Sequence, residues 1–74
     1  MDYYKLKTVI MKQISGHLER REEIVADGGT PPKFADFQRK LILEHGISEK
    51  MIKQMVEVIV PNGTVENGEI VRNE

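Results

Sequence analysis

The chain contains no cysteine and no tryptophan, and aromatic residues make up only 5% of its 74 residues. The lack of cysteine excludes disulfide bonds and cysteine-ligated zinc. So short a chain is expected to form one small domain, which buries only about 60% of the surface that the unfolded chain exposes. We therefore expect a thin hydrophobic core and no bound cofactor.

Long hydrophobic runs are also absent. The run at 58–60 contains three apolar residues, and no run is longer. A membrane-spanning helix needs about 20 consecutive apolar residues. The first residues, Met1 to Lys5, lack the apolar core of a secretory signal. From these absences we expect a cytoplasmic protein that makes no membrane contact.

Neither sign of charge is in excess. The 11 basic and 12 acidic residues give a net charge of −1, whereas a protein that coats nucleic acid is normally clearly basic. The charges are grouped in blocks: residues 1–21 and 33–56 are net basic, and residues 22–32 and 57–74 are net acidic. The overall charge is therefore a poor guide to partners, and the local distribution matters more.

Residues 1–26 have the spacing of a first helix. Their apolar side chains recur every four residues, at Leu6, Ile10, Ile14 and Leu18. Asp2 is suited to cap the first turn of this helix. The helix is expected to end before residues 28–32, because two glycines and two prolines there break the pattern.

Two shorter helices are predicted at residues 30–45 and 47–60. Thr30 is a suitable cap for the earlier of the two, and the prolines after it fit a first helical turn. Gly46 is suited to a left-handed helix end, and Ser48 is suited to cap the helix that follows. The β-branched residues at 58–60 are compatible with a helix end or with a strand.

The last part of the chain has the pattern of a hairpin. Asn67-Gly68 separates two short β-type segments, and this pair is the strongest short signal for a type I′ turn. We therefore predict a β-hairpin over residues 64–72. The predicted fold class is α+β, with three helices followed by a C-terminal hairpin in a single domain of residues 1–74.

Residues 41–55 resemble a helix-turn-helix motif. The turn glycine, Gly46, comes five residues after the apolar Leu41, and the apolar Ile47 follows it at once. Two further apolar residues, Ile52 and Met55, are spaced to face inward from the second helix. This pattern suits two helices that cross steeply over a short turn.

Together with the hairpin, the order of elements resembles that of the winged-helix superfamily. The resemblance covers residues 34–71 and does not single out one family. Two positions depart from the motif. Ile42 stands where a small residue is preferred for close helix contact, and His45 stands where an apolar residue is preferred.

The resemblance implies a small regulatory protein that binds DNA, with the second helix of the motif in the major groove. Lysines on that helix would neutralise phosphates, and Gln54 would read adenine edges. The same lysines are also compatible with an ordinary solvated helix face. The DNA-contacting residues implied by the resemblance are Arg39, Lys40, Ser48, Lys50, Lys53 and Gln54.

The acidic hairpin tip supports a second interpretation. Wings that contact DNA are usually basic, whereas here Glu66 and Glu69 flank the predicted turn. The same fold would then serve as a protein-binding adaptor or inhibitor that makes no DNA contact. The contact surface predicted for that alternative consists of Glu22, Glu23, Asp27, Glu66 and Glu69.

No pattern of catalytic or metal-binding residues is present. The two histidines, His17 and His45, lack carboxylates at ligand spacing, and Ser15 and Ser48 lack a histidine–acid partner set. We predict neither an enzyme nor a metal site. The first helix is long for so small a domain, so the sequence leaves open a homodimer through residues 3–18.

Overall fold

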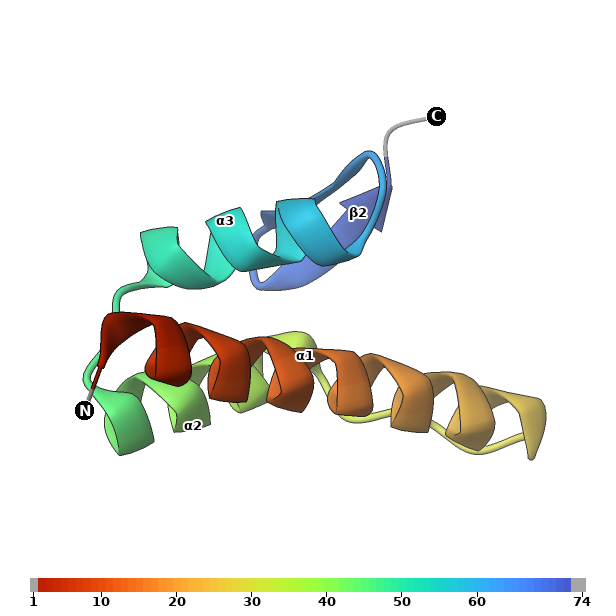
Figure 1. Cartoon of the computed structure of the whole chain (residues 1–74). Helices are drawn as coiled ribbons and strands as arrows, with labels where there is room; N and C mark the ends of the chain where they lie inside the picture. The colour runs from red at the N-terminus through yellow and green to blue at the C-terminus, as the bar shows by residue number, and fades with distance from the viewer. Residues whose placement is uncertain (1, 73–74) are drawn as a thin grey trace. The chain divides into compact units, whose positions relative to one another are not determined.

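The computed structural model describes residues 2–72 and has the predicted α+β fold class (Figure 1). Three helices precede a two-stranded antiparallel sheet. The chain divides into two compact units, residues 1–31 and residues 32–74. The elements are α1 (Tyr3–Ala26) in the first unit and α2 (Phe34–His45), α3 (Glu49–Ile59), β1 (Gly63–Glu66) and β2 (Glu69–Arg72) in the second.

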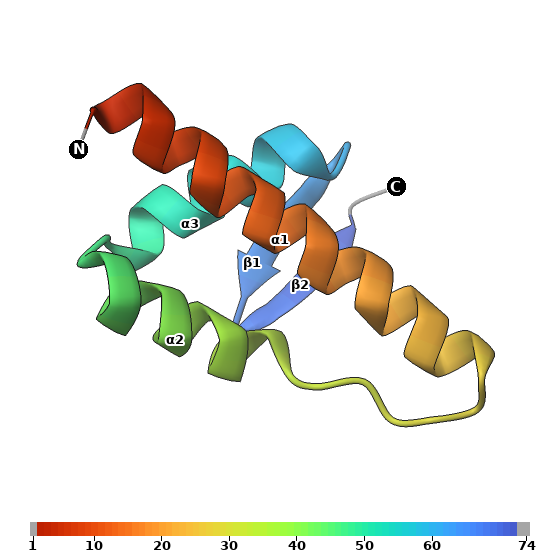
Figure 2. The ribbon, with the colours of Figure 1, turned by 60° about the horizontal axis from the view of Figure 1, so that its bottom comes forward.

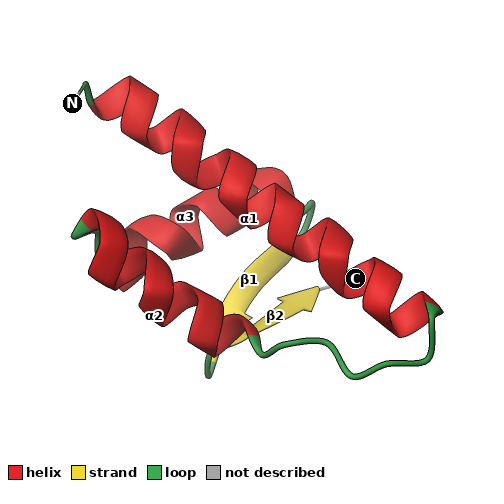
Figure 3. Cartoon of the chain, turned by 90° about the horizontal axis from the view of Figure 1, so that it is seen from below, coloured by secondary structure: helices red, strands yellow, loops and turns green. Residues whose placement is uncertain are grey.

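The helix α1 is unbroken from Tyr3 to Ala26 (Figure 3), and it is capped at both ends. A side-chain oxygen of Asp2 accepts a hydrogen bond from the backbone N–H of Tyr4 at 3.1 Å, as predicted. At the other end Gly28 has φ = +83°, and Gly29 donates its N–H to the carbonyl of Ile24 at 2.8 Å. These two features form a Schellman motif, which ends the helix where the glycine pair begins.

The most buried side of α1 carries the apolar residues that recur every four positions, Leu6, Ile10, Ile14 and Leu18. Ile10 and Ile14 have no exposed surface, and Leu6 and Leu18 are half-buried. Among the described residues, no helix has both the length and the hydrophobicity needed to cross a bilayer.

The helix α2 begins at Phe34, so the predicted start at residue 30 is wrong. Lys33 occupies the position before the helix with extended backbone (φ −70°, ψ 137°), and no side chain caps the first turn. The reason lies in the two prolines. A residue that precedes proline is kept out of the helical region, so Pro31, which precedes Pro32, is not expected to begin the helix. Because α2 begins at Phe34, Thr30 lies four residues before the helix, too far to act as the predicted cap.

The turn between α2 and α3 follows the predicted pattern. Gly46 is left-handed (φ +64°) and donates its N–H to the carbonyl of Ile42 at 2.9 Å. Ser48 then caps α3 by accepting a hydrogen bond from the N–H of Met51 at 3.2 Å. The helix α3 is shorter than the predicted 47–60, because residues 47 and 48 precede its first turn. Residues 58 and 59 are helical and Val60 is extended.

The second unit buries apolar side chains from both helices and from the turn. The spacing that predicted the helix-turn-helix matches the burial, since all four of its apolar positions are buried. The buried hydrophobic residues of this unit are Phe34, Leu41, Ile47, Ile52, Met55, Val56 and Val60. The element order is compatible with a winged helix.

The hairpin has the predicted type of turn. Asn67 and Gly68 both have positive φ, 52° and 76°, and they connect strands paired in the register Val65↔Ile70. The strands run from residue 63 to residue 72, one residue longer than predicted at the start. Figure 2 shows this turn beside the first turn of α2.

The contact between hairpin tip and helix is close. A Cβ atom added to Gly68 would lie 2.7 Å from the Cβ of Ala35. Only a glycine at this position allows the tip to approach the helix so closely. The hairpin is therefore seated against α2 and does not project freely from the unit.

Candidate functional site

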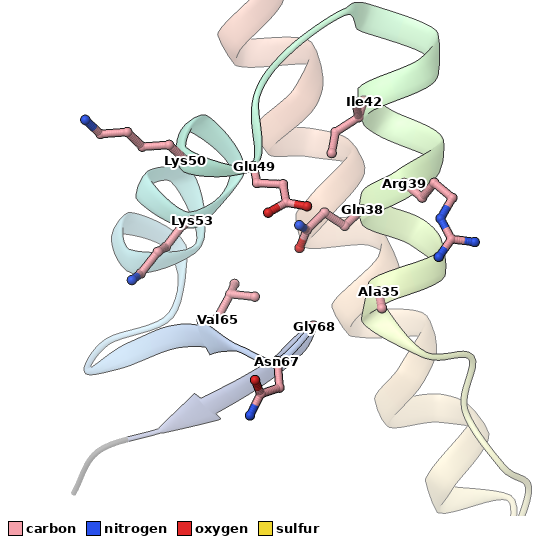
Figure 4. Close-up of a pocket in the computed structure, with 10 residues that line it drawn as sticks. All are labelled: Ala35, Gln38, Arg39, Ile42, Glu49, Lys50, Lys53, Val65, Asn67 and Gly68. Carbon is pink, nitrogen blue, oxygen red and sulfur yellow. The ribbon is translucent and has the colours of Figure 1, made fainter.

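The elements of the second unit surround an open pocket of about 580 Å³ (Figure 4). This volume lies within the range of small-molecule sites, roughly 300–1,000 Å³. Below, this hollow is called the α2–α3 pocket. Its lining residues are Ala35, Gln38, Arg39 and Ile42 from α2, Glu49, Lys50 and Lys53 from α3, and Val65, Asn67 and Gly68 from the hairpin.

Local structure explains how these side chains meet. The Gly46 turn and the Ser48 cap fix the first turn of α3, where Glu49 lies. On α2, Ala35, Gln38 and Ile42 are spaced three and four residues apart, so they share one face of the helix. The seated hairpin tip then closes the side of the pocket beyond Ala35.

The pocket has a cationic rim. Arg39, Lys50 and Lys53 are all exposed, and in Figure 4 the two lysines extend from α3 while the arginine extends from α2. Among residues 2–72 none of the three forms an ion pair. Glu49 is the one carboxylate among the lining residues. The pocket is therefore net positive, and its cations are available to an anion.

The centre of the pocket is polar. Figure 4 shows the carboxylate of Glu49 and the amide of Gln38 directed toward each other. The Oε1 atom of Gln38 is buried and has no hydrogen-bond partner among the described residues. Leaving a buried acceptor unpaired costs about 1–3 kcal/mol. The apolar side chains of Ile42 and Val65 lie beside this polar centre.

Of the six predicted DNA-contacting residues, three line the pocket and three do not. Arg39, Lys50 and Lys53 line the pocket, whereas the Nζ of Lys40 lies 3.9 Å from a carboxylate oxygen of Glu44. The hydroxyl of Ser48 is already used as the cap of α3. Gln54 is exposed and lies outside the pocket lining.

The acidic residues of the alternative interpretation occupy both units. Glu66 and Glu69 are exposed and are paired directly across the two strands. Like charges in that position destabilise a strand pair. Glu22, Glu23 and Asp27 are exposed near the end of α1, in the unit that does not contain the hairpin.

Neither histidine belongs to a metal site in the described part of the chain. No group of three or more potential ligand side chains is placed to hold an ion there. Burial lowers the pKa of His17 below its usual 6.5, and the positive charges of Arg21 and Arg20 act in the same direction. The Nε2 of His45 lies 3.9 Å from a carboxylate oxygen of Glu44.

The sequence did not predict that Gln38 lines the pocket or that the hairpin tip approaches Ala35. The helical spacing of Gln38 and Ile42 was a usable signal, because it places both side chains on one face. No local sequence pattern indicates that the hairpin tip contacts α2.

Comparison with known proteins found no matching family model, no matching curated protein and no matching solved structure.

Proposed function

We propose that the chain is a cytoplasmic, non-enzymatic regulator that binds duplex DNA through α2 and α3. The observation that carries this proposal is the set of exposed cations on both helices, Arg39, Lys50 and Lys53, none of which is engaged in an ion pair within residues 2–72. The left-handed Gly46 turn and the buried apolar positions support a helix-turn-helix. Phosphate contacts from such cations position a protein on DNA.

In this proposal the hairpin makes no DNA contact. Its tip carries Glu66 and Glu69, which DNA phosphates would repel, and Gly68 is seated against Ala35. Residues 32–72 carry six basic and six acidic side chains, so the attraction to DNA is confined to the helical face. Gln54, an exposed residue next to Lys53 on α3, is proposed to read a base edge.

Fluorescence anisotropy with a short duplex at several salt concentrations tests the proposal. Binding should weaken steeply between about 50 and 200 mM salt, and Lys50→Gln or Lys53→Gln should each lower the salt slope by about 1. Lys12→Gln, an exposed cation of α1, is the matched control and should leave the slope unchanged. Absence of binding at about 50 mM salt, or an equal effect of the control, would refute the proposal.

A homodimer through residues 3–18 is part of the same proposal. Tyr3, Tyr4 and Val9 on α1 are 56%, 74% and 40% exposed, and a shallow hollow along this helix is lined by Tyr4, Lys5, Thr8 and Val9. Sedimentation equilibrium should show a dimer that Val9→Glu disrupts. A monomer at all concentrations would remove the dimer from the proposal without affecting the DNA contact.

The acidic hairpin favours the alternative, a protein-binding adaptor or inhibitor. Two carboxylates paired across the strands form a concentrated negative surface that a basic protein segment would fit. If the duplex does not bind, this alternative predicts that Glu66→Gln with Glu69→Gln abolishes capture of a protein partner. The double variant should leave capture unchanged if the acidic tip is not the contact.

A further inference from the structure

We propose that the α2–α3 pocket binds a free nucleotide, with an amino-bearing base at its centre and the phosphate at its rim. The inference stands independently of duplex binding, because it rests on the interior of the pocket. Three features carry it: a polar centre with unmet hydrogen-bonding capacity, apolar walls beside that centre, and cations at the edge.

The polar centre selects the kind of base. The Glu49 carboxylate only accepts hydrogen bonds, and it faces the Gln38 amide (Figure 4). A carboxylate accepts from the exocyclic amino group of a base, and the amide NH2 of Gln38 can donate to the neighbouring ring nitrogen. A base that presents a carbonyl in place of the amino group, as uracil does, would be repelled by Glu49.

The apolar walls and the cationic rim of the pocket also fit a nucleotide. Ile42 from α2 and Val65 from the hairpin offer apolar surface to the flat faces of a base. Arg39 on α2 and Lys50 and Lys53 on α3 lie on opposite sides of this centre with their charged ends directed outward (Figure 4), and they have no ion pair among residues 2–72. Charge-assisted hydrogen bonds from such cations suit a phosphate group.

Nucleotide and duplex would therefore compete. The lysines assigned to the phosphates of DNA are the same lysines that line the pocket. A bound nucleotide would place a negative charge on the face that the duplex must approach. If both proposals hold, the nucleotide lowers the affinity for DNA. If only the pocket proposal holds, the nucleotide binds and duplex DNA does not.

The test is a titration of the nitrogen-15-labelled full chain with adenosine monophosphate, uridine monophosphate and inorganic phosphate, followed through amide chemical shifts. Adenosine monophosphate should produce saturable shifts at Gln38, Glu49, Val65 and Gly68. Uridine monophosphate should bind at least about fivefold more weakly, since a correct base contact gives that much discrimination. Inorganic phosphate should shift only the residues of the cationic rim.

Three variants separate base recognition from charge. Glu49→Gln should reduce the preference for adenosine over uridine monophosphate, because its amide can also donate to a carbonyl. Arg39→Gln should weaken both nucleotides equally. Lys40→Gln, which removes the neighbouring cation of α2 outside the pocket lining, should change neither affinity.

Several results would overturn the inference. Equal affinity for the two nucleotides would show that the base is not read, and equal shifts by inorganic phosphate would show a general anion site. Shifts confined to residues 2–31 would place binding outside the pocket. A preference that survives Glu49→Gln in a folded variant would also contradict the assignment.

Discussion

Replacement of Gly68 by alanine should destabilise the chain by about 2–5 kcal/mol. Gly68 has φ = +76°, and a left-handed conformation costs an L-residue about 1–2 kcal/mol. The added Cβ would lie 2.7 Å from the Cβ of Ala35, well inside the roughly 3.5–4.0 Å of favourable carbon contact. Neither methyl group has a rotamer that avoids the other. The hairpin tip must move away from α2, and overpacking of this kind costs about 1–3 kcal/mol.

Two further variants separate these contributions. Gly46 also has positive φ (64°), but a Cβ there would meet no atom within 4 Å. Gly46→Ala should therefore lower the free energy of unfolding only by the cost of the left-handed conformation, about 1–2 kcal/mol. Ala35→Gly removes the obstructing methyl group, at a helix cost of about 1 kcal/mol. Added to Gly68→Ala, it should give less destabilisation than the two single changes summed.

Urea denaturation followed by far-ultraviolet circular dichroism measures these differences. In a domain of this size each kcal/mol lowers the thermal midpoint by about 4–8 °C, which gives an independent reading. The reasoning is refuted if Gly68→Ala costs no more than Gly46→Ala. It is equally refuted if the double variant shows no coupling between positions 35 and 68.

Three other predictions follow from local features. Ser48→Ala should lower the free energy of unfolding in urea by about 1 kcal/mol, because it removes the cap of α3. Gln38→Met should raise it by about 1 kcal/mol in the same assay, since a buried acceptor without a partner is removed. The pKa of His17 is lowered below 6.5 in the folded chain, so the unfolded chain binds a proton at higher pH; stability should be complete above about pH 6.5 and fall below it. Urea midpoints measured from pH 7 to pH 5 should show this decline, and His17→Gln should flatten it.

The local patterns of the chain predicted most of the second unit. Gly46, Ser48 and the Asn67-Gly68 pair each act through their own backbone geometry, which needs no distant partner. The predicted start of α2 was wrong, because the first of two consecutive prolines is kept out of the helical region by the second. That effect is also local, so it was available in the sequence.

The pocket was not predictable in the same way. Arg39, Lys50 and Lys53 were expected at the functional surface for their charge, but that expectation says nothing about a hollow between them. The hollow exists because the hairpin tip is seated on Ala35, a residue with no chemical signal of its own. The unpartnered Oε1 atom of Gln38 was not predictable either, because it is buried only in the folded chain.

The seat of the hairpin on α2 also has a kinetic consequence. The other neighbours in the second unit are joined by short connections, since α2 meets α3 across one tight turn and β1 meets β2 across another. Such local contacts form quickly. The contact of Gly68 with Ala35 instead closes a loop of roughly 30 residues, whose ordering entropy must be lost before the contact forms. We therefore expect the contact between the hairpin tip and α2 to form after the transition state of folding. Substitutions at this contact should then change chiefly the rate of unfolding.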